Sequence, residues 1–357
     1  MNTKEAIGQI VAGRSLSEHD MREVMDQIMS GEASPSQIGS FITALRMKGE
    51  TVDEITGAVR VMRQKATFVD TGVDTEHGGV LLDIVGTGGD CAGTFNVSST
   101  SAFVIAAGGV MVAKHGNRAV SSHCGSADVL EALGVDLSLP PDKVADCVRQ
   151  VGIGFLFAPL LHGAMRHTIG PRREIGIRTM FNILGPMTNP AGANVQVSGV
   201  YEPGLTTVLA EVLVRLGMKR ALIVCGESDQ GNLDEITVTG PTRIADGQSD
   251  GDSGQVNCYS ITPEQFGIER ASLADISGGK SGAEAAEQVR AILSGAEQGA
   301  KTDMVAMNAG AALMAAGKAT DMAAGIERAR RIIKSGAAAE KLAKLVEFCR
   351  NNSGSRP

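Results

Sequence analysis

The chain of 357 residues is 43% hydrophobic and 20% charged, with a formal net charge of -7, a balance that excludes disorder and argues against bulk nucleic-acid binding. Its 45 glycines follow no three-residue period, which excludes collagen, and the longest nearly apolar run, 104–113, is too short to span a membrane. The six cysteines form no C-x-x-C pair, so no zinc site or redox motif is indicated, and we expect a soluble, cytoplasmic protein of about two domains.

Residues 1–68 are predicted to be helical throughout. One helix face is marked by apolar residues at helical spacing: Met21, Val24, Met25, Ile28 and Met29. Capping boxes at 34–37 and 51–54 predict the starts of two further helices. Four such helices would form a small bundle whose remaining apolar surface packs on the rest of the protein. A surface for a partner helix is the alternative.

From residue 80 onward, short apolar runs alternate with helical stretches. The runs are 81–85, 110–113, 153–157, 195–200 and 221–225. This alternation is typical of a parallel sheet with crossover helices. The Asp- and Gly-rich stretch 245–254 is predicted to be a turn or a mobile loop, and residues 283–348 are predicted to return to helix.

A glycine-rich loop, Gly86-Thr87-Gly88-Gly89-Asp90, directly follows the first predicted strand. Ligands gather at the carboxyl ends of parallel strands, and glycine lets backbone N–H groups approach an anion closely. The loop matches neither the dinucleotide fingerprint nor the P-loop, because Cys91 replaces a required glycine and no G-K-[ST] follows. Helix capping is the ordinary explanation for polar residues at a helix start. Four of them beside this loop favour phosphate binding instead: Thr94, Asn96, Ser98 and Ser99.

A second polar loop, 114–122, follows the next predicted strand with the sequence KHGNRAVSS. Lys114 can neutralise a phosphate as a point charge, and Arg118 suits bidentate contacts. Two polar loops after neighbouring strands predict a ligand with more than one phosphate. A structural role is the alternative for His115, and a solvated basic turn is the alternative for the whole segment.

Two further segments carry chemistry. Asp234 and Glu235 follow another predicted strand and its loop; near a polyphosphate they would attract Mg²⁺, and elsewhere they would be ordinary surface charge. The segment 172–190 begins with Arg172-Arg173-Glu174 and ends in two proline-bearing turns. We expect it to be a hinge or lid between the helical and α/β parts, with a tight connection of no ligand-binding role as the alternative.

These four segments, in this order, resemble the anthranilate phosphoribosyltransferase family. The resemblance covers nearly the whole chain and rests on GTGGD, KHGNR, the RRE-to-TNP stretch, and LDEI followed by TGPT. It implies the α/β fold of nucleoside phosphorylases and phosphoribosyltransferases, with a small N-terminal α-helical domain and a large α/β domain around a central, mainly parallel sheet. The expected boundaries are 1–72, with a returning segment at 172–190, and 73–357. The implied reaction moves the phosphoribosyl group of 5-phosphoribosyl 1-pyrophosphate to the amine of anthranilate, in tryptophan biosynthesis.

The resemblance also assigns site residues. The 5-phosphoribosyl 1-pyrophosphate site would take Gly86, Gly89, Asp90, Thr94, Asn96, Ser98, Ser99, Lys114, Asn117, Ser121, Ser122 and Ser126, with Gly116 and Arg118 as further substrate contacts. Magnesium would be held by Ser98, Asp234 and Glu235. Asn117 and Arg172 would contact anthranilate, with His115 and Pro186 lining its path. The implied catalytic residues are Lys114, His115, Asn117 and Arg172.

The chain departs from the family pattern at Ser99, where threonine is commoner, at His162-Gly163 in place of His-Pro, and in a longer loop at 226–232. The family suggests a homodimer through the N-terminal helices and an association with anthranilate synthase, with no nucleic-acid or membrane partner. Two other activities stay open. A pyrimidine nucleoside phosphorylase would have a loop resembling KHSTGG, and a nucleic-acid-binding paralogue would lack Asn117 and Arg172.

Overall fold

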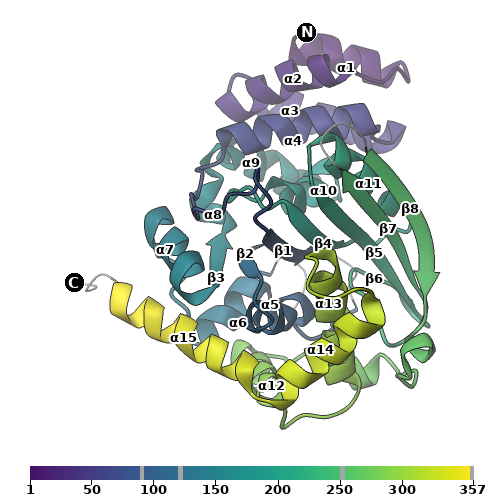
Figure 1. The fold of residues 1–357 in the computed structure, drawn as a ribbon. Helices are drawn as coiled ribbons and strands as arrows, with labels where there is room; N and C mark the ends of the chain where they lie inside the picture. Colours follow the sequence, from purple (N-terminus) through teal and green to yellow (C-terminus); the bar gives the residue numbers. More distant parts are fainter. Residues whose placement is uncertain (89–91, 120–123, 250–253, 354–357) are drawn as a thin grey trace.

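Four amphipathic helices open the chain and lie together at one end of the molecule (Figure 1). They are α1 (Thr3–Val11), α2 (Glu18–Ser30), α3 (Pro35–Lys48) and α4 (Val52–Lys65) in a computed structural model that describes residues 1–88, 92–119, 124–249 and 254–353. Both predicted capping boxes form, at the starts of α3 and α4. The predicted apolar face of α2 is buried. The helical start of the chain is therefore confirmed.

An eight-stranded sheet occupies the centre of the remaining chain, in the order β3-β2-β1-β4-β5-β7-β8 with β6 paired to β5. Its strands are β1 (Leu81–Gly86), β2 (Met111–Gly116), β3 (Ile153–Phe157), β4 (Val195–Gly199), β5 (Arg220–Ser228), β6 (Gly231–Leu233), β7 (Thr242–Ser249) and β8 (Gly254–Ile261). The five neighbouring strands β3, β2, β1, β4 and β5 pair in parallel, as predicted. The pairs that β6, β7 and β8 form are antiparallel. The parallel strands therefore end at one edge, where Gly86 lies opposite Gly199.

Helices cover both faces of this sheet, and β5 shows how the faces are separated. Leu222 and Val224 belong to a core that includes the helices α5 (Val97–Ala107) and α13 (Ala300–Ala315). The alternate residues Ala221, Ile223 and Cys225 belong to a second core, with α11 (Gly204–Arg215) and the N-terminal helices. Successive side chains of a strand point to opposite faces, so a strand with no polar face is buried between two helical layers.

The other helices complete these layers. They are α6 (Ser126–Ala132), α7 (Pro141–Val151), α8 (Ala158–Leu161), α9 (Arg166–Ile175), α10 (Met180–Leu184), α12 (Gly282–Leu293), α14 (Met322–Lys334) and α15 (Ala337–Asn352), with short 3₁₀ turns η1 (Gly163–Met165), η2 (Gly185–Thr188), η3 (Pro263–Phe266) and η4 (Ala274–Ile276). The helices α13 and α14 approach closely at Gly310 and Gly325: a Cβ on Gly325 would lie 2.3 Å from the Gly310 carbonyl oxygen. None of the helices in the described residues is long and apolar enough to cross a bilayer.

The helices α9 and α10 return to the N-terminal bundle. The helix α9 packs on α2 and α3, and α10 packs on α3 and α4. Residues 66–69, which follow α4, are hydrogen-bonded to the chain just before α9, at Leu161, and to the chain after α10, at Pro190. The N–H of Thr67 donates to the Leu161 carbonyl at 2.8 Å, and the N–H of Val69 donates to the Pro190 carbonyl at 3.0 Å.

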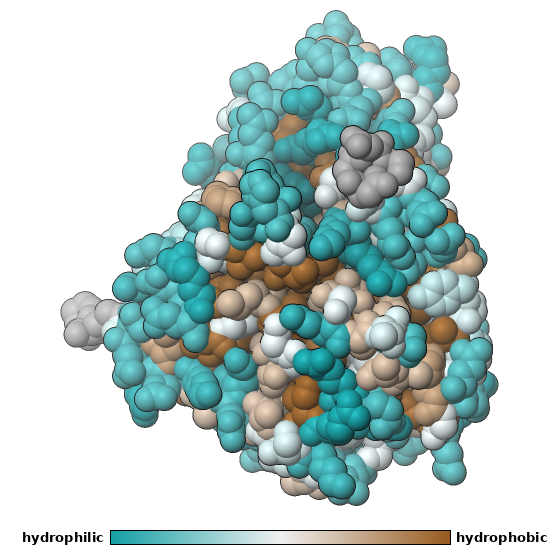
Figure 2. Space-filling view, viewed as in Figure 1, coloured by the Kyte–Doolittle hydropathy of each residue, from teal (hydrophilic) through white to brown (hydrophobic). Residues whose placement is uncertain are grey.

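Hydrophobic residues gather across the middle of the face shown in Figure 2, whereas the helices at either end of that face are mainly hydrophilic. The N-terminal helices nonetheless expose single apolar side chains. Val11 and Met47 are 72% and 84% exposed. The N-terminal helical bundle therefore has apolar side chains that no other described residue covers.

The prediction of a turn or a mobile loop at 245–254 is wrong for the described part of that stretch, which contributes to the antiparallel pair β7 and β8; residues 250–253 lie outside the described residues. Three of its described residues, Asp246, Gly247 and Gly254, have partners that the local sequence does not reveal. Asp246 pairs with Arg220 on β5 at 2.8 Å. A Cβ on Gly247 or Gly254 would meet the side chain of Val214 on α11, at 2.9 and 2.0 Å. These glycines let the helix lie close to the sheet.

A buried polar network joins β1, β2 and the end of the returning stretch. Asp83, in the middle of β1, is fully buried and accepts from the backbone N–H of His115 at 3.1 Å and from the side-chain amide of Asn189 at 2.8 Å. The same amide donates to the Ala113 carbonyl at 2.8 Å, and the Asn189 Oδ1 accepts from the N–H of Ala191. Burial raises the pKa of Asp83 to about 6, opposed by Lys114 and these hydrogen bonds. Asn189 thus fixes the end of the returning stretch to two sheet strands.

Replacing Asn189 with alanine is expected to lower the free energy of unfolding by about 2–4 kcal/mol, because it leaves buried polar groups on Asp83, Ala113 and Ala191 without that partner. Urea unfolding followed by circular dichroism measures the change. Asn257→Ala, at an exposed position on β8, is the matched control and should change the stability by less than about 0.5 kcal/mol. Equal losses in both variants would contradict the structural role given to Asn189.

Candidate phosphate and metal site

Glycines end β1 and β4 side by side, and the acidic pair Asp234-Glu235 occupies the space that they leave. The N–H of Thr87, just after β1, donates to the carbonyl of Gly199 at 2.9 Å. A Cβ on Gly199 would lie 1.5 Å from the Asp234 carbonyl oxygen. Both acidic residues are 8% exposed, so they are not the surface charges that the alternative interpretation allowed.

Backbone N–H groups from two directions bind these carboxylates. The N–H of Gly88 donates to Asp234 Oδ2 at 2.6 Å, and the N–H of Ser98, in the first turn of α5, donates to Glu235 Oε1 at 3.2 Å. A helix N-terminus carries partial positive charge, which favours an anion there. The sequence therefore folds into an anion-binding concavity, and in this structure its own carboxylates accept those hydrogen bonds.

Lys114 supplies the buried positive charge of the site. Its side chain is 3% exposed, and its Nζ donates to the carbonyl of Ile84 at 2.7 Å and to Ser98 Oγ at 3.3 Å. Burial lowers the pKa of this amine, while Asp83 and Glu235 raise it. The two carboxylates thus favour the charged form of Lys114 at the start of α5.

The polar residues around the start of α5 are not explained by helix capping. Asn96 occupies the N-cap position but its side chain makes no capping hydrogen bond; its amide donates to the Cys124 carbonyl at 3.2 Å. Thr94 forms an isolated antiparallel bridge with Ser277. The hydroxyl oxygens of Thr87 and Ser99 are buried with no hydrogen-bond partner within the described part of the chain. Ser101 and Thr179, outside the predicted site, share this property, so an unpaired hydroxyl does not by itself mark a ligand contact.

The described start of the loop after β2 packs against α6. A Cβ on Gly116 would lie 2.3 Å from Ser126 Oγ, and that hydroxyl donates to the Asn117 carbonyl at 3.1 Å. Arg118 is turned toward α6, where it pairs with Asp128 and Glu131 at 2.9 Å. The structure does not bring the Arg118 guanidinium to the acidic pair, and for Arg118 the solvated basic turn is the better interpretation.

His115 and His162 face each other at the ends of β2 and β3, and Pro186 is bonded to β4. The rings of His115 and His162 are buried, and their Nε2 atoms are 3.2 Å apart. Burial lowers the pKa of His115 to about 3, helped by His162 and Lys114, and lowers that of His162 to about 4. The Pro186 carbonyl accepts from the side-chain amide of Gln196 on β4 at 2.7 Å. Both imidazoles are therefore neutral near pH 7.

Arg172 lies on α9, in the part of the chain that returns to the N-terminal helices. Its guanidinium lies 5.3 Å from the centroid of the Phe181 ring, and burial lowers its pKa. An arginine that stacks on an aromatic ring keeps its N–H edge available for a carboxylate. The neighbouring Arg173 is exposed.

Four of the predicted site residues, Gly89, Asp90, Ser121 and Ser122, lie outside the described residues. Other residues of the site were missed by the sequence interpretation: Asp83, Asn189 and Gly199, with His162 mentioned only as a departure from a pattern. The available signal was Asp83, a charged residue inside an otherwise apolar strand, which is rarely buried without a partner.

Adjacent buried carboxylates suit a hard divalent cation such as Mg²⁺, which takes one or two carboxylates and completes its shell with water and phosphate oxygens. Asp234 and Glu235, with the Ser98 hydroxyl nearby, fit that requirement. No cluster of three or more acidic, histidine or cysteine residues that could hold a metal occurs among the described ranges.

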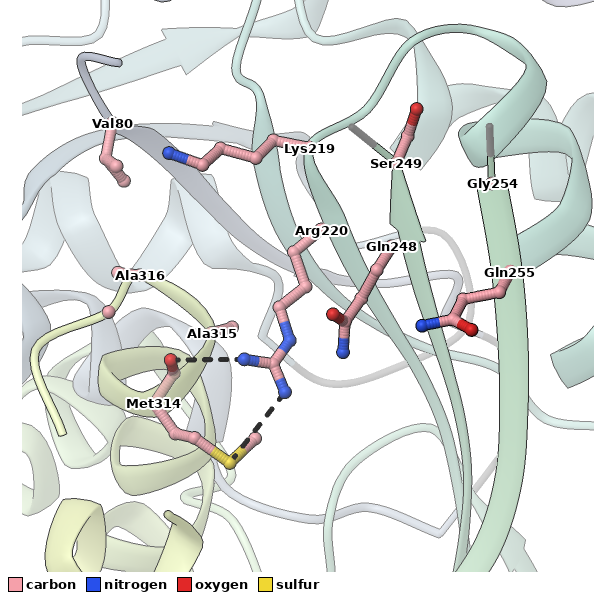
Figure 3. A pocket seen from close by; sticks show the side chains of 11 residues that line it. Val80, Lys219, Arg220, Gln248, Ser249, Gly254, Gln255, Met314, Ala315 and Ala316 are labelled. Atoms are coloured by element: carbon pink, nitrogen blue, oxygen red, sulfur yellow. Dashed lines mark hydrogen bonds between the residues drawn. The ribbon is translucent and has the colours of Figure 1, made fainter. Parts of the chain in front are cut away.

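A separate cavity of about 780 Å³ lies at the opposite edge of the sheet, where the parallel strands begin (Figure 3). Lys219, Arg220 and Gln248 line it on the strand side, and Met314 lines it on the α13 side. The Arg220 guanidinium is held by Asp246 and by the carbonyl and sulfur of Met314. This cavity contains none of the residues of the site described above.

Comparison with known proteins connects this geometry to a family. The chain matches the models for the helical bundle domain (residues 4–66) and the a/b domain (residues 78–339) of the glycosyl transferase family. It is 62% identical to the anthranilate phosphoribosyltransferase of Desulfotalea psychrophila, over 98% of this chain and 97% of the relative, and 56% identical to that of Citrifermentans bemidjiense, over 96% and 97%. The solved structure from Thermus thermophilus superposes with a TM-score of 0.88 at 44% identity, covering 97% of this chain and 99% of the other. The Saccharomyces cerevisiae structure in complex with PRPP and Mg has a TM-score of 0.84 at 27% identity, covering 98% of both chains. The predicted fold class is confirmed.

Gly199→Ala is expected to displace the acidic pair, because its Cβ would overlap the Asp234 backbone. The free energy of unfolding should fall by about 1–3 kcal/mol, and the N–H of Gly88 should exchange with deuterium faster because its acceptor has moved. Gly204→Ala, at the start of α11 with no atom within 4 Å of its Cβ, is the control and should leave both quantities unchanged. Slow exchange at Gly88 in the Gly199 variant would contradict the close packing.

Proposed function

We propose roles for the site residues of this chain, which belongs to the anthranilate phosphoribosyltransferase family. The chain is a glycosyltransferase of tryptophan biosynthesis: it transfers the phosphoribosyl group of 5-phosphoribosyl 1-pyrophosphate to the amine of anthranilate and releases pyrophosphate. The relatives favour neither the pyrimidine nucleoside phosphorylase nor the nucleic-acid-binding paralogue. The roles of individual residues go beyond that activity and depend on the geometry of the site.

The observation that carries the proposal is the convergence of the Gly88 and Ser98 N–H groups on Asp234 and Glu235. We assign Mg²⁺ to Ser98, Asp234 and Glu235, because hard oxygen donors beside an anion-binding loop suit that ion. When bound, magnesium would neutralise charge on the departing pyrophosphate. The S. cerevisiae relative in complex with PRPP and Mg supports this choice of ion.

We assign the phosphates to the glycine loop, the start of α5 and Lys114. Phosphate oxygens would approach beside the N–H groups of Gly88 and Ser98, which donate to the acidic pair in this structure. Lys114 adds a buried positive charge at Ser98. The unpaired hydroxyls of Thr87 and Ser99 supply further donors. The predicted contacts further along the two polar loops, at Gly89, Asp90, Ser121 and Ser122, remain predictions from the sequence.

We assign the anthranilate carboxylate to Arg172, with Asn117 as a second contact and with His115 and Pro186 along its path. Arg172 stacks on Phe181 and is half-buried, which strengthens its attraction for a carboxylate. The solved S. cerevisiae relative in complex with 4-fluoroanthranilate supports an aminobenzoate as the acceptor substrate.

The reaction needs no general base to activate the acceptor amine. The amine of anthranilate is an aniline, neutral at pH 7, so its lone pair can attack C1 of the ribose without prior deprotonation. The C1–N bond forms as the C1–O bond to pyrophosphate breaks, the bonding electron pair leaves with pyrophosphate, and the nitrogen then loses one proton to water or to the released pyrophosphate. Holding the two reactants in line and stabilising the charge that develops on the leaving group are the main contributions that Arg172, Lys114 and the loop N–H groups make.

We further propose the organisation around this site. The helical domain comprises residues 1–72 with a returning segment at 172–190, which the packing of α9 and α10 on α2, α3 and α4 supports, and the α/β domain comprises 73–357. A homodimer through the N-terminal helices would cover the exposed Val11 and Met47. A cytoplasmic location and an association with anthranilate synthase, which supplies the acceptor, complete the proposal.

The activity is tested by the loss of anthranilate fluorescence when the purified protein receives 5-phosphoribosyl 1-pyrophosphate and magnesium. The double variant Asp234→Asn, Glu235→Gln should reduce the turnover by at least about 100-fold and leave the fold intact, because both amides keep an acceptor for the loop N–H groups. The double variant Glu227→Gln, Asp229→Asn removes the same charge from exposed positions nearby and should retain activity. No fluorescence loss with the wild type would overturn the assigned activity, and near-normal turnover of the first variant at limiting magnesium would overturn the metal assignment.

Arg172→Ala should raise the KM for anthranilate by about 10–100-fold, because it removes a charged hydrogen bond to the carboxylate, and should leave the KM for 5-phosphoribosyl 1-pyrophosphate unchanged. Steady-state kinetics with each substrate varied in turn measure both constants. Arg173→Ala, one residue along α9 and exposed, is the matched control. A lost kcat with an unchanged anthranilate KM would assign the carboxylate elsewhere.

A further inference from the structure

A buried asparagine lies in the middle of α13, among residues that are otherwise apolar. Asn308 is 0% exposed, and its neighbours in the helix, Met307 and Ala309, are equally buried. Asparagine is unfavourable inside a helix, and a buried amide costs free energy unless it is hydrogen-bonded. Asn308 therefore requires hydrogen-bond partners in the folded chain.

The main partner of Asn308 is Ile236, the residue that directly follows the acidic pair. Its Oδ1 accepts from the Ile236 N–H at 3.1 Å, and its Nδ2 donates to the Ile236 carbonyl at 2.7 Å and to the Met304 carbonyl, one turn back in α13, at 2.9 Å. The opposite orientation of the amide would set its NH₂ group against an N–H and its oxygen against two carbonyls. The side chain thus pairs with the backbone of Ile236 in one way only.

The helix that carries Asn308 also packs on the elements around the acidic pair. The helix α13 contacts β4, which ends beside Asp234, and α5, whose Ser98 N–H donates to Glu235 (Figure 1). It is itself packed closely on α14 at Gly310. Asn308 therefore connects the segment after the acids to a helix that is fixed in the core.

The backbone on either side of Ile236 is also closely held. A Cβ on Gly226 would lie 2.6 Å from the Glu235 carbonyl oxygen, so β5 passes directly against that peptide group. The N–H of Thr237 donates to Thr242 Oγ1, at the start of β7, at 3.1 Å. Contacts from α13, β5 and β7 thus determine where the backbone of the acidic pair lies.

We propose that Asn308 is a positioning residue for the transfer reaction: by bonding both backbone groups of Ile236, it fixes the segment that carries Asp234 and Glu235 where magnesium and pyrophosphate bind. The inference rests on the proposed function of that pair. Both amide hydrogens of Asn308 are used within the protein, so the residue acts through the backbone next to the acids. Loss of a group that holds metal ligands in place typically lowers metal affinity by about 10–100-fold.

Binding of inorganic pyrophosphate, measured by isothermal titration calorimetry with and without Mg²⁺, tests the inference without turnover. In the wild type, Mg²⁺ should tighten the binding of pyrophosphate. Asn308→Leu keeps a similar volume but removes the amide, and it should lose about tenfold of the affinity that Mg²⁺ adds, with little change when Mg²⁺ is absent. An Asn308→Leu variant that keeps the full effect of Mg²⁺ would overturn the inference.

Leu313→Ala is the matched control. Leu313 is buried on the same helix, and its Cδ2 would lie 2.6 Å from a Cβ on Gly108, at the end of α5. Its truncation should destabilise the core and leave the effect of Mg²⁺ unchanged. Equal losses of that effect in the Leu313 and Asn308 variants would show a general loss of stability and would contradict a positioning role.

The double variant Asp234→Asn, Glu235→Gln separates this inference from the proposed function. If that variant loses the effect of Mg²⁺ and Asn308→Leu does not, the role of Asn308 alone is overturned. If the double variant retains the effect, the metal assignment is overturned, and the role of Asn308 with it.

Hydrogen exchange in the wild type decides the question even if Asn308→Leu does not fold. Coupling between two sites is reciprocal, so an ion whose binding needs the contact between Asn308 and Ile236 must in turn stabilise that contact. Saturating Mg²⁺ and pyrophosphate should therefore slow the exchange of the Ile236 N–H, followed by nuclear magnetic resonance, by about tenfold. An unchanged exchange rate at Ile236 would overturn the inference.

Discussion

Two hydrogen bonds from backbone N–H groups to adjacent carboxylates determine how the site is built. Gly88 belongs to the loop after β1 and Ser98 to the first turn of α5, while Asp234 and Glu235 lie on the chain after β6. The bonds therefore connect three separate parts of the fold at the edge where the parallel strands end. Glu235, together with Asp83 on β1, also favours the charged form of Lys114, which is buried in the same place. A buried charge is costly unless it is paired, so these contacts explain how an ammonium group is accommodated here.

The glycines at the strand ends make this arrangement sterically feasible. A Cβ on Gly86 would lie 2.4 Å from a carboxylate oxygen of Asp234, and a Cβ on Gly226 would lie 2.6 Å from the Glu235 carbonyl. The acidic pair thus occupies volume that side chains would fill if the neighbouring strand residues were not glycines. Part of the glycine excess in the composition is explained in this way, by space for two acids as much as by room for a ligand.

The elements of the fold were largely predictable, and the partnerships within the site were not. Apolar periodicity and capping boxes are local signals, and they predicted the N-terminal helices and the five parallel strands. The polar loops were also visible, because side chains for one ligand crowd the ends of strands. The pairing of Gly88 with Asp234 spans 146 residues, so only the folded chain could reveal it. The wrong prediction at 245–254 has the same cause. Asp is typical of turns, and only the folded chain shows that Asp246 pairs with Arg220 on the neighbouring strand β5. Asp83 escaped notice for the related reason that its partner Asn189 comes from a distant stretch.

The hydrogen bonds of residues 66–69 have a mechanical consequence. The chain crosses between the helical part and the sheet three times: at residues 66–69, near Leu161 and near Pro190. The first crossing is hydrogen-bonded to the other two, through Thr67 to Leu161 and through Val69 to Pro190. These two backbone hydrogen bonds hold the three crossings together at one place, next to His162 and Asn189 in the sequence, whereas Arg172 lies further along the returning stretch, on α9. The parts of the site on either side of this joint are therefore connected by the backbone as well as by side chains.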